Sequence, residues 1–178
     1  MSAAINPFLD ALSASGPAAD RADKMALYGW LVGSWDLEVT EFPENGRPFA
    51  RPGEWHFGWA LEGRAIQDVW MVPSRRAGRH EDAAAHSERY GSTLRVYDPS
   101  IDAWHIQWTE PVGQVYLRQI GRKEGARIVQ TGTSSDGRGM RWSFNDITPD
   151  SFVWRSEVSN DRGETWRVNV EFSARRVA

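Results

Sequence analysis

From Ser34 onward the chain alternates apolar and polar residues in short runs that turn residues interrupt. A period of two is typical of strands with one apolar face. We predict ten strands, over residues 35–41, 53–61, 64–72, 90–97, 104–109, 114–121, 127–133, 140–146, 151–158 and 165–174. Turn sequences such as PENG, DPSID and NDRG separate them, so each strand is expected to pair with the next in a meander.

The apolar faces of these strands are rich in aromatic residues. Four strands each place their apolar residues on a common face: Trp55, Phe57, Trp59 and Leu61; Trp104, Ile106 and Trp108; Phe152, Trp154 and Val158; Trp166, Val168, Val170 and Phe172. The opposite faces are mostly polar. A ten-stranded meander with one apolar face buries that face by closing into a barrel, which also removes exposed strand edges.

Two other segments depart from this pattern. Apolar residues at helical spacing within residues 1–31 predict two short helices, so we expect a helical segment over residues 1–33 that packs on a barrel formed by residues 34–178. Residues 74–89, SRRAGRHEDAAAHSER, are too polar and unpatterned for a strand. We interpret them as a flexible flap or a disordered insertion.

Composition narrows the classes of partner. The chain has 178 residues, a net charge of −3 and no cysteine. One domain with a sizeable core is expected, and the charge balance disfavours nucleic acid as a partner. The lack of cysteine excludes disulfides and thiolate metal sites and suits the cytoplasm. The first residues have neither a basic segment nor a long apolar run, so we expect no membrane association and a cytoplasmic location.

The residues Gly33-Ser34-Trp35 begin the first predicted strand just after a helix. They resemble the Gly-x-Trp signature of the calycin barrels, the superfamily of lipocalins and fatty-acid-binding proteins. The resemblance implies that Trp35 plugs the closed end of the barrel beneath a basic side chain of the last strand, here Arg175 or Arg176.

A broader likeness covers nearly all of residues 30–176. The phrases GEWHFGWALEGRAIQDVW, YGSTLRVYDPSIDAWHIQW and SDGRGMRWSFNDITPDSFVWRSEVSNDRGETW resemble an uncharacterised bacterial family of calycin-like barrel proteins. The resemblance implies an all-β fold, a ten-stranded antiparallel up-and-down barrel with two short N-terminal helices. It brings no catalytic residues.

Nitrobindin is a haem-binding, ten-stranded member of the same superfamily. It has a longer glycine-rich motif in its first strand and a proximal histidine late in the chain. This sequence continues GSWDLEV and has no histidine after His105. The departure argues against haem, and we expect no cofactor.

A ten-stranded barrel is too wide for its own side chains to fill, so part of the interior is expected to bind a ligand. The predicted ligand-binding residues are Trp55, Trp59, Asp68, Trp70, Arg95, Tyr97, Trp104, Trp108, Tyr116, Arg141, Trp142 and Trp154. Several of these indoles are equally well explained as core. Either Gln67 or Asp68 points inward, and a buried Asp68 needs Arg95 or Arg141 as a partner. Alternatively, Asp68 and the arginines form a ladder on the outer face.

The chain carries few groups for acid and base chemistry. His80 and His86 lie in the polar insertion without a scaffold that fixes metal geometry, so no metal site is expected. His56 and His105 lie on the faces opposite the aromatic ones. If a bulge inverted either strand, His56 or His105 would enter the cavity as a general base; Asp68 is the third catalytic candidate.

The sequence therefore favours a binding protein that holds a small apolar or aromatic molecule in a tryptophan-lined cavity. The alternative is a cofactor-independent isomerase, lyase or cyclase that acts on a hydrophobic substrate in the same cavity; it rests on analogy of fold. A third reading is an interaction platform that pairs two copies of the chain as a homodimer.

Overall fold

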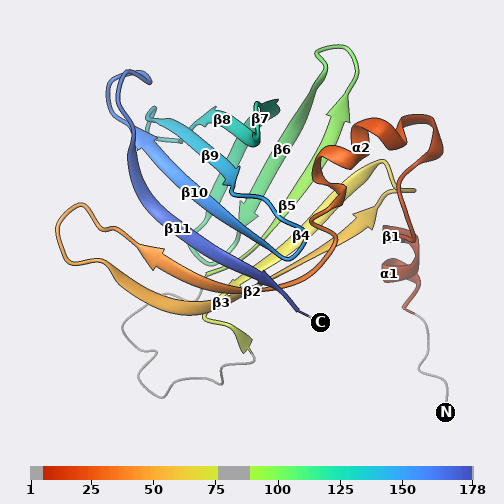
Figure 1. Cartoon of the computed structure of the whole chain (residues 1–178), viewed down its shortest axis with the longest axis horizontal. Helices are drawn as coiled ribbons and strands as arrows, with labels where there is room; N and C mark the ends of the chain where they lie inside the picture. Colours follow the sequence, from red (N-terminus) through yellow and green to blue (C-terminus); the bar gives the residue numbers. More distant parts are fainter. Residues whose placement is uncertain (1–5, 76–88, 178) are drawn as a thin grey trace.

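The computed structural model describes residues 6–75 and 89–177. Ten antiparallel strands form a closed barrel (Figure 1). They are β2 (Gly33–Glu41), β3 (Phe49–Ala60), β4 (Ala65–Val72), β5 (Arg89–Asp98), β6 (Ala103–Glu110), β7 (Val115–Glu124), β8 (Arg127–Thr133), β9 (Gly139–Asn145), β10 (Ser151–Ser159) and β11 (Arg167–Arg176). Each strand pairs with the next along the chain, and β11 pairs with β2 to close the ring. The predicted ten-stranded barrel is confirmed.

β3 is longer than the sequence pattern predicted. It begins at Phe49 rather than Gly53, and Pro52 takes part in the ladder opposite Glu38. The proline and glycine of the run FARPG are typical of a loop, which is why the first part of the strand was missed. The strand ends at Ala60 because Leu61 and Glu62 adopt positive φ angles of 51° and 58° in the following turn.

A β-bulge in β11 corrects the predicted face of its first half. Ser156 of β10 pairs with Val170, whereas the next residue, Glu157, pairs with Val168. Asn169 is therefore the extra residue of the bulge. Val168 lies on the outer face with Glu157, and not on the inner face with Val170 as the uninterrupted alternation predicted.

The interior of the barrel is filled largely by aromatic rings. Trp154 stacks on Phe172 with their ring centroids 4.4 Å apart, and Trp35 meets Phe152 edge to face at 4.7 Å. Such geometries add to the free energy gained by burying the rings. The alternation of apolar and polar residues therefore builds one continuous core inside the barrel.

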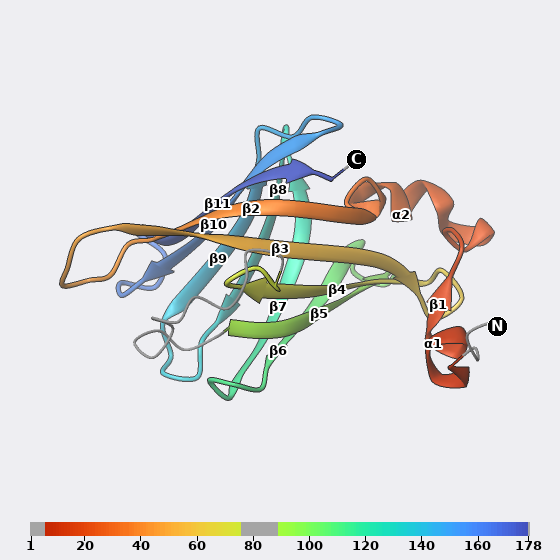
Figure 2. The ribbon, with the colours of Figure 1, turned by 90° about the horizontal axis from the view of Figure 1, so that it is seen from below.

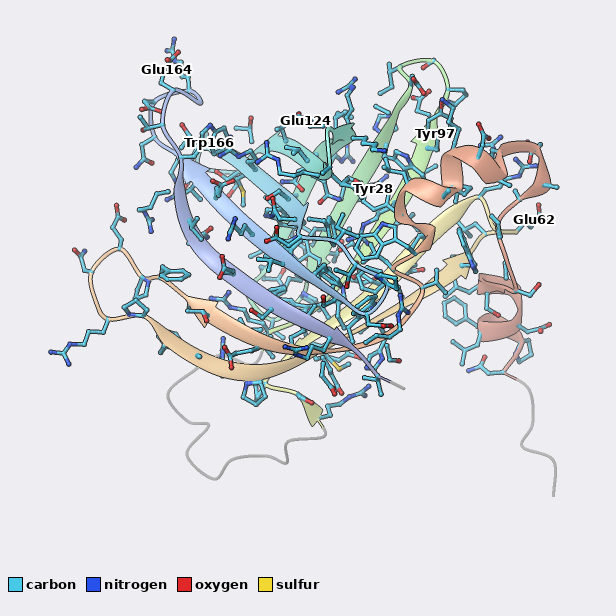
Figure 3. All side chains as sticks on the ribbon, in the orientation of Figure 1. Tyr28, Glu62, Tyr97, Glu124, Glu164 and Trp166 are labelled. Atoms are coloured by element: carbon cyan, nitrogen blue, oxygen red, sulfur yellow. The ribbon has the colours of Figure 1, made fainter. Side chains whose placement is uncertain are left out.

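The N-terminal helices lie at one end of the barrel (Figures 1 and 2). They are α1 (Pro7–Leu12), the 3₁₀ turn η1 (Ala19–Arg21) and α2 (Ala22–Gly29), and a short strand, β1 (Ser13–Ala14), pairs with β3 outside the barrel. Met25 and Tyr28 of α2 are fully buried. Tyr28 extends from α2 toward the barrel strands (Figure 3), and its ring meets Trp104 at 4.9 Å. α2 therefore caps this end of the barrel.

The Gly-x-Trp residues form a compact joint between the first and last strands. The Trp35 indole is fully buried and donates to the carbonyl of Leu31 at 2.7 Å. The Arg176 guanidinium lies 4.1 Å from the centre of the Trp35 ring. Arg176 also donates to three backbone carbonyls, those of Trp30 at 2.6 Å, Val32 at 3.0 Å and Pro149 at 2.9 Å. Of the two arginines that the resemblance suggested, Arg176 is the one that covers the tryptophan.

Gly33 is required by this joint. Its φ of +127° is strained for other residues, and a Cβ atom built there would lie 2.9 Å from the Arg176 guanidinium.

In the described part of the chain, no helix has the length and apolar character needed to cross a membrane.

We predict that Arg176→Lys lowers the free energy of unfolding by about 1–3 kcal/mol, because a lysine ammonium cannot stack on Trp35 and reach three carbonyls at once. Chemical denaturation followed by fluorescence measures the change. Arg175→Lys is the matched control, because Arg175 is the preceding residue of the same strand and its side chain is exposed. Equal stability of the two variants would contradict the assigned role.

Candidate functional site

A cavity of about 440 Å³ lies inside the barrel, toward the end opposite α2. Figure 3 labels Trp166 beside β11 at that end of the molecule. Six aromatic residues, one from each of six strands, line the cavity: Trp55, Trp70, Trp108, Trp142, Trp154 and Phe172. The volume is in the range of sites for small organic molecules.

The cavity indoles form a connected wall. Trp70 lies 5.5 Å from Trp108, Trp108 lies 6.1 Å from Trp142, and Trp142 lies 5.4 Å from Trp154, measured between ring centroids. Most of these pairs meet at steep angles rather than stacking flat. Both ring faces and ring edges therefore border the space between them.

Two charged residues lie at the mouth of the cavity, and both are already engaged. The Glu110 carboxylate is buried and accepts the backbone N–H groups of Val112 at 2.8 Å and Gly113 at 2.9 Å. Arg89 donates to Glu41 at 2.8 Å. Glu110 therefore shapes the β6–β7 turn that borders the cavity, and Arg89 is held at the rim.

A buried ion pair lies deeper in the barrel. Asp68 and Arg95 are each 1 % exposed; the Arg95 guanidinium donates to the Asp68 carboxylate, which also accepts the Thr93 backbone N–H at 3.0 Å. The guanidinium lies 5.3 Å from the ring centre of Phe57 and 5.6 Å from that of Tyr28. Thr93 and the cavity-lining Trp55, whose ring centre is 6.0 Å from the guanidinium, connect this pair with the cavity.

This arrangement resolves the alternatives left open for Asp68. The carboxylate lies inside the barrel, and the outer-face ladder is wrong for this residue. Arg95 is its partner, whereas Arg141 forms a two-pronged pair with Glu157 on the outer face, with both distances 2.7 Å. Arg141 also lies 4.3 Å from the ring centre of Trp166 and does not line the cavity.

The interior also holds amide and phenol groups near α2. Gln130 is fully buried and donates to the Tyr28 hydroxyl at 2.9 Å. Burial raises the pKa of Tyr28 to about 12. Gln119 is 4 % exposed, and neither its amide nitrogen nor its amide oxygen has a partner among the described residues.

Both strand histidines lie outside the cavity. His56 contacts the Ser34 hydroxyl through Nδ1 at 2.8 Å and lies 3.7 Å from the Glu54 carboxylate through Nε2. The His105 ring is exposed, 3.0 Å from Asp98, and hydrogen bonds from Ser100 and then His105 lower the pKa of Asp98 to about 2. The register around both histidines is uninterrupted, so no bulge turns either side chain into the cavity. Neither His56 nor His105 is therefore placed to act as a general base there.

The remaining predicted site residues lie elsewhere. Trp59 approaches Gly29 at the end of α2, and Trp104 packs under Tyr28. The Tyr97 hydroxyl donates to Asp102 at 2.6 Å. Tyr116 is 61 % exposed and donates to Gln114 at 3.0 Å.

His80, His86 and nearly all of the predicted flap lie outside the described residues. Among the described residues there is no cluster of three or more side chains suited to bind a metal.

The predicted ligand-binding residues left out eleven residues that line the cavity: Arg89, Thr93, Glu110, Val112, Gly113, Val115, Met140, Ser156, Asn169, Val170 and Phe172. Ser156 was within reach, because it alternates with Trp154 on the same face of β10. Asn169 was not, because it enters the lining through the bulge, which the apolar pattern does not mark. No signal in the sequence places the β6–β7 turn beside the cavity.

The comparisons with known proteins agree with the fold. No protein-family model matches the chain, and no curated protein matches it. Among solved structures, Rv2717c from M. tuberculosis is similar with a TM-score of 0.60 and 15 % identity, covering 91 % of this chain and 99 % of its own. The S-type phycobiliprotein lyase CPES from Guillardia theta has a TM-score of 0.58 and 12 % identity, with the same coverage of both chains. These likenesses show the barrel fold and nothing about activity.

We predict that Arg95→Met lowers the free energy of unfolding by about 3–5 kcal/mol, because it leaves the Asp68 carboxylate buried without its cation. The double variant Asp68→Asn/Arg95→Met is expected to be more stable than Arg95→Met alone, because no charge is then stranded. Denaturation in urea measures both.

The control for this prediction is Arg138→Met, which removes an exposed ion pair with Asp136 and is expected to cost less than about 1 kcal/mol. If the double variant were no more stable than the single one, packing rather than charge would account for the loss.

We predict a pH-dependent contribution from Tyr28. Its pKa in the folded state is raised from 10.0 to about 12, so its contribution to stability is complete below pH 10 and is lost as the pH rises to 12. Over that interval the stability of the wild type relative to Tyr28→Phe should fall by about 2–3 kcal/mol. Denaturation of both proteins at several pH values tests this, with Tyr116→Phe as the exposed control. A constant difference would contradict it.

Proposed function

We propose that the protein binds a small, flat, largely aromatic molecule in the tryptophan-lined cavity of the barrel. The observation that carries the proposal is the cavity of about 440 Å³ walled by five indoles. Filling the space between aromatic side chains with an aromatic guest removes apolar surface from water on both partners. A lyase among the solved structures of similar fold acts, by its name, on phycobiliproteins, and this is compatible with a barrel that handles small molecules.

The enzymatic alternative has less support. The histidines considered as bases lie outside the cavity, and Asp68 is committed to Arg95 and to the Thr93 backbone. Glu110 accepts two backbone N–H groups at the cavity mouth. We therefore favour binding over catalysis. The cytoplasmic location and the homodimer stay predictions from the sequence.

We predict that the wild-type protein takes up a flat tricyclic aromatic probe, 9-fluorenone or fluorene, with a dissociation constant on the order of 1–100 µM, as expected for a ligand of this size. Ser156→Phe should weaken binding by about tenfold or more, because the added ring occupies the cavity that Ser156 lines. Equilibrium dialysis with quantification of the free probe measures both.

Ser173→Phe is the matched control, because Ser173 is exposed on the outer face of the barrel. It is expected to bind like the wild type. If neither probe binds, or if both serine variants bind like the wild type, the proposed function is wrong.

A further inference from the structure

We infer that the cavity selects neutral aromatic molecules that carry carbonyl-type hydrogen-bond acceptors, an inference that rests on the proposed function and specifies its ligand. Three of the cavity tryptophans, Trp55, Trp70 and Trp142, are 4–7 % exposed. The indole N–H of each is buried and has no acceptor among the described residues. Buried polar groups in proteins almost always have a partner, so three neighbouring exceptions around one cavity indicate a missing one.

The fold satisfies indole groups elsewhere. Three tryptophans that do not line the cavity donate to backbone carbonyls: Trp30 to Leu27 at 2.9 Å, Trp35 to Leu31 at 2.7 Å and Trp166 to Gly163 at 3.0 Å. Among the described residues, all three buried indole N–H groups without an acceptor thus belong to tryptophans that line the cavity.

The chemistry of the indole fixes what the missing partner is. An indole N–H is a donor and never an acceptor, whereas an amide such as Asn169, whose Oδ1 is also buried and unpartnered at the cavity, can turn either end toward a ligand. Three unpartnered donors on side chains that line one cavity call for acceptor atoms. A ligand with a carbonyl oxygen offers such an atom, whereas a hydrocarbon leaves all three donors without a partner.

The charges at the site indicate a neutral ligand. Among the described residues that line the cavity, Arg89 is the single cation, and it is paired with Glu41 at 2.8 Å. The Glu110 carboxylate at the mouth opposes a second negative charge. A carboxylate ligand would thus lack a free cation, whereas a ketone or quinone oxygen needs only the indole donors.

The matched probes 9-fluorenone and fluorene test this inference, because they share one tricyclic frame and differ by a carbonyl in place of a methylene. In equilibrium dialysis 9-fluorenone is expected to bind wild-type protein about tenfold more tightly than fluorene. Trp→Phe variants at positions 55, 70 and 142 keep an aromatic ring and remove the N–H. At least one of them should lose about fivefold or more in affinity for 9-fluorenone while its affinity for fluorene changes less than about twofold.

Trp166→Phe is the control, since its N–H already has an acceptor outside the cavity. Circular dichroism and thermal melting confirm that each variant is folded. If fluorene binds as tightly as 9-fluorenone and Ser156→Phe blocks both, the proposed function stands and the selection for acceptors is wrong. The same conclusion follows if all three Trp→Phe variants bind both probes like the wild type. Binding of neither probe to the wild type overturns both proposals.

Discussion

The pairing of the first and last barrel strands is the constraint on which the rest of the molecule depends. β2 and β11 join in an antiparallel ladder that runs from Glu41 and Val170 to Trp35 and Arg176. All other barrel pairings join neighbours along the chain, so this one alone converts a one-faced sheet into an enclosed interior. The Arg176 guanidinium fastens one end of the ladder by bonding carbonyls before β2 and before β10 while covering Trp35.

Closure creates two interior regions with different physical characters. Near α2 the interior is filled by the buried rings of Tyr28, Trp35, Phe144 and Phe152. The Tyr28 hydroxyl there accepts a hydrogen bond from Gln130. Toward the other end the indoles line a space that they do not fill. The buried Asp68–Arg95 pair lies between these regions, and its free-energy cost is compensated by mutual attraction and by the surrounding rings.

The sequence predicted the fold well because strand alternation is a local signal. Trp104, Ile106 and Trp108 were expected on one inner face, and all three are buried there. The same logic could have assigned Ser156 to the cavity. It failed where geometry is not local: the bulge at Asn169 shifts the register of β11, and only the three-dimensional arrangement decides that Asp68 pairs with Arg95 rather than Arg141. Tryptophan content alone did not separate core indoles such as Trp104 from cavity indoles such as Trp142.

Both proposals require that a bound ligand contact the cavity indoles, and the second requires that it accept hydrogen bonds from their N–H groups. The most direct measurement is a ¹H–¹⁵N correlation spectrum of the indole region, with the ten signals assigned by substitution, recorded as 9-fluorenone is added. We expect the signals of Trp55, Trp70 and Trp142 to move while those of Trp30, Trp35 and Trp166 stay in place. Unmoved cavity signals, or equal movement of all signals, would contradict it.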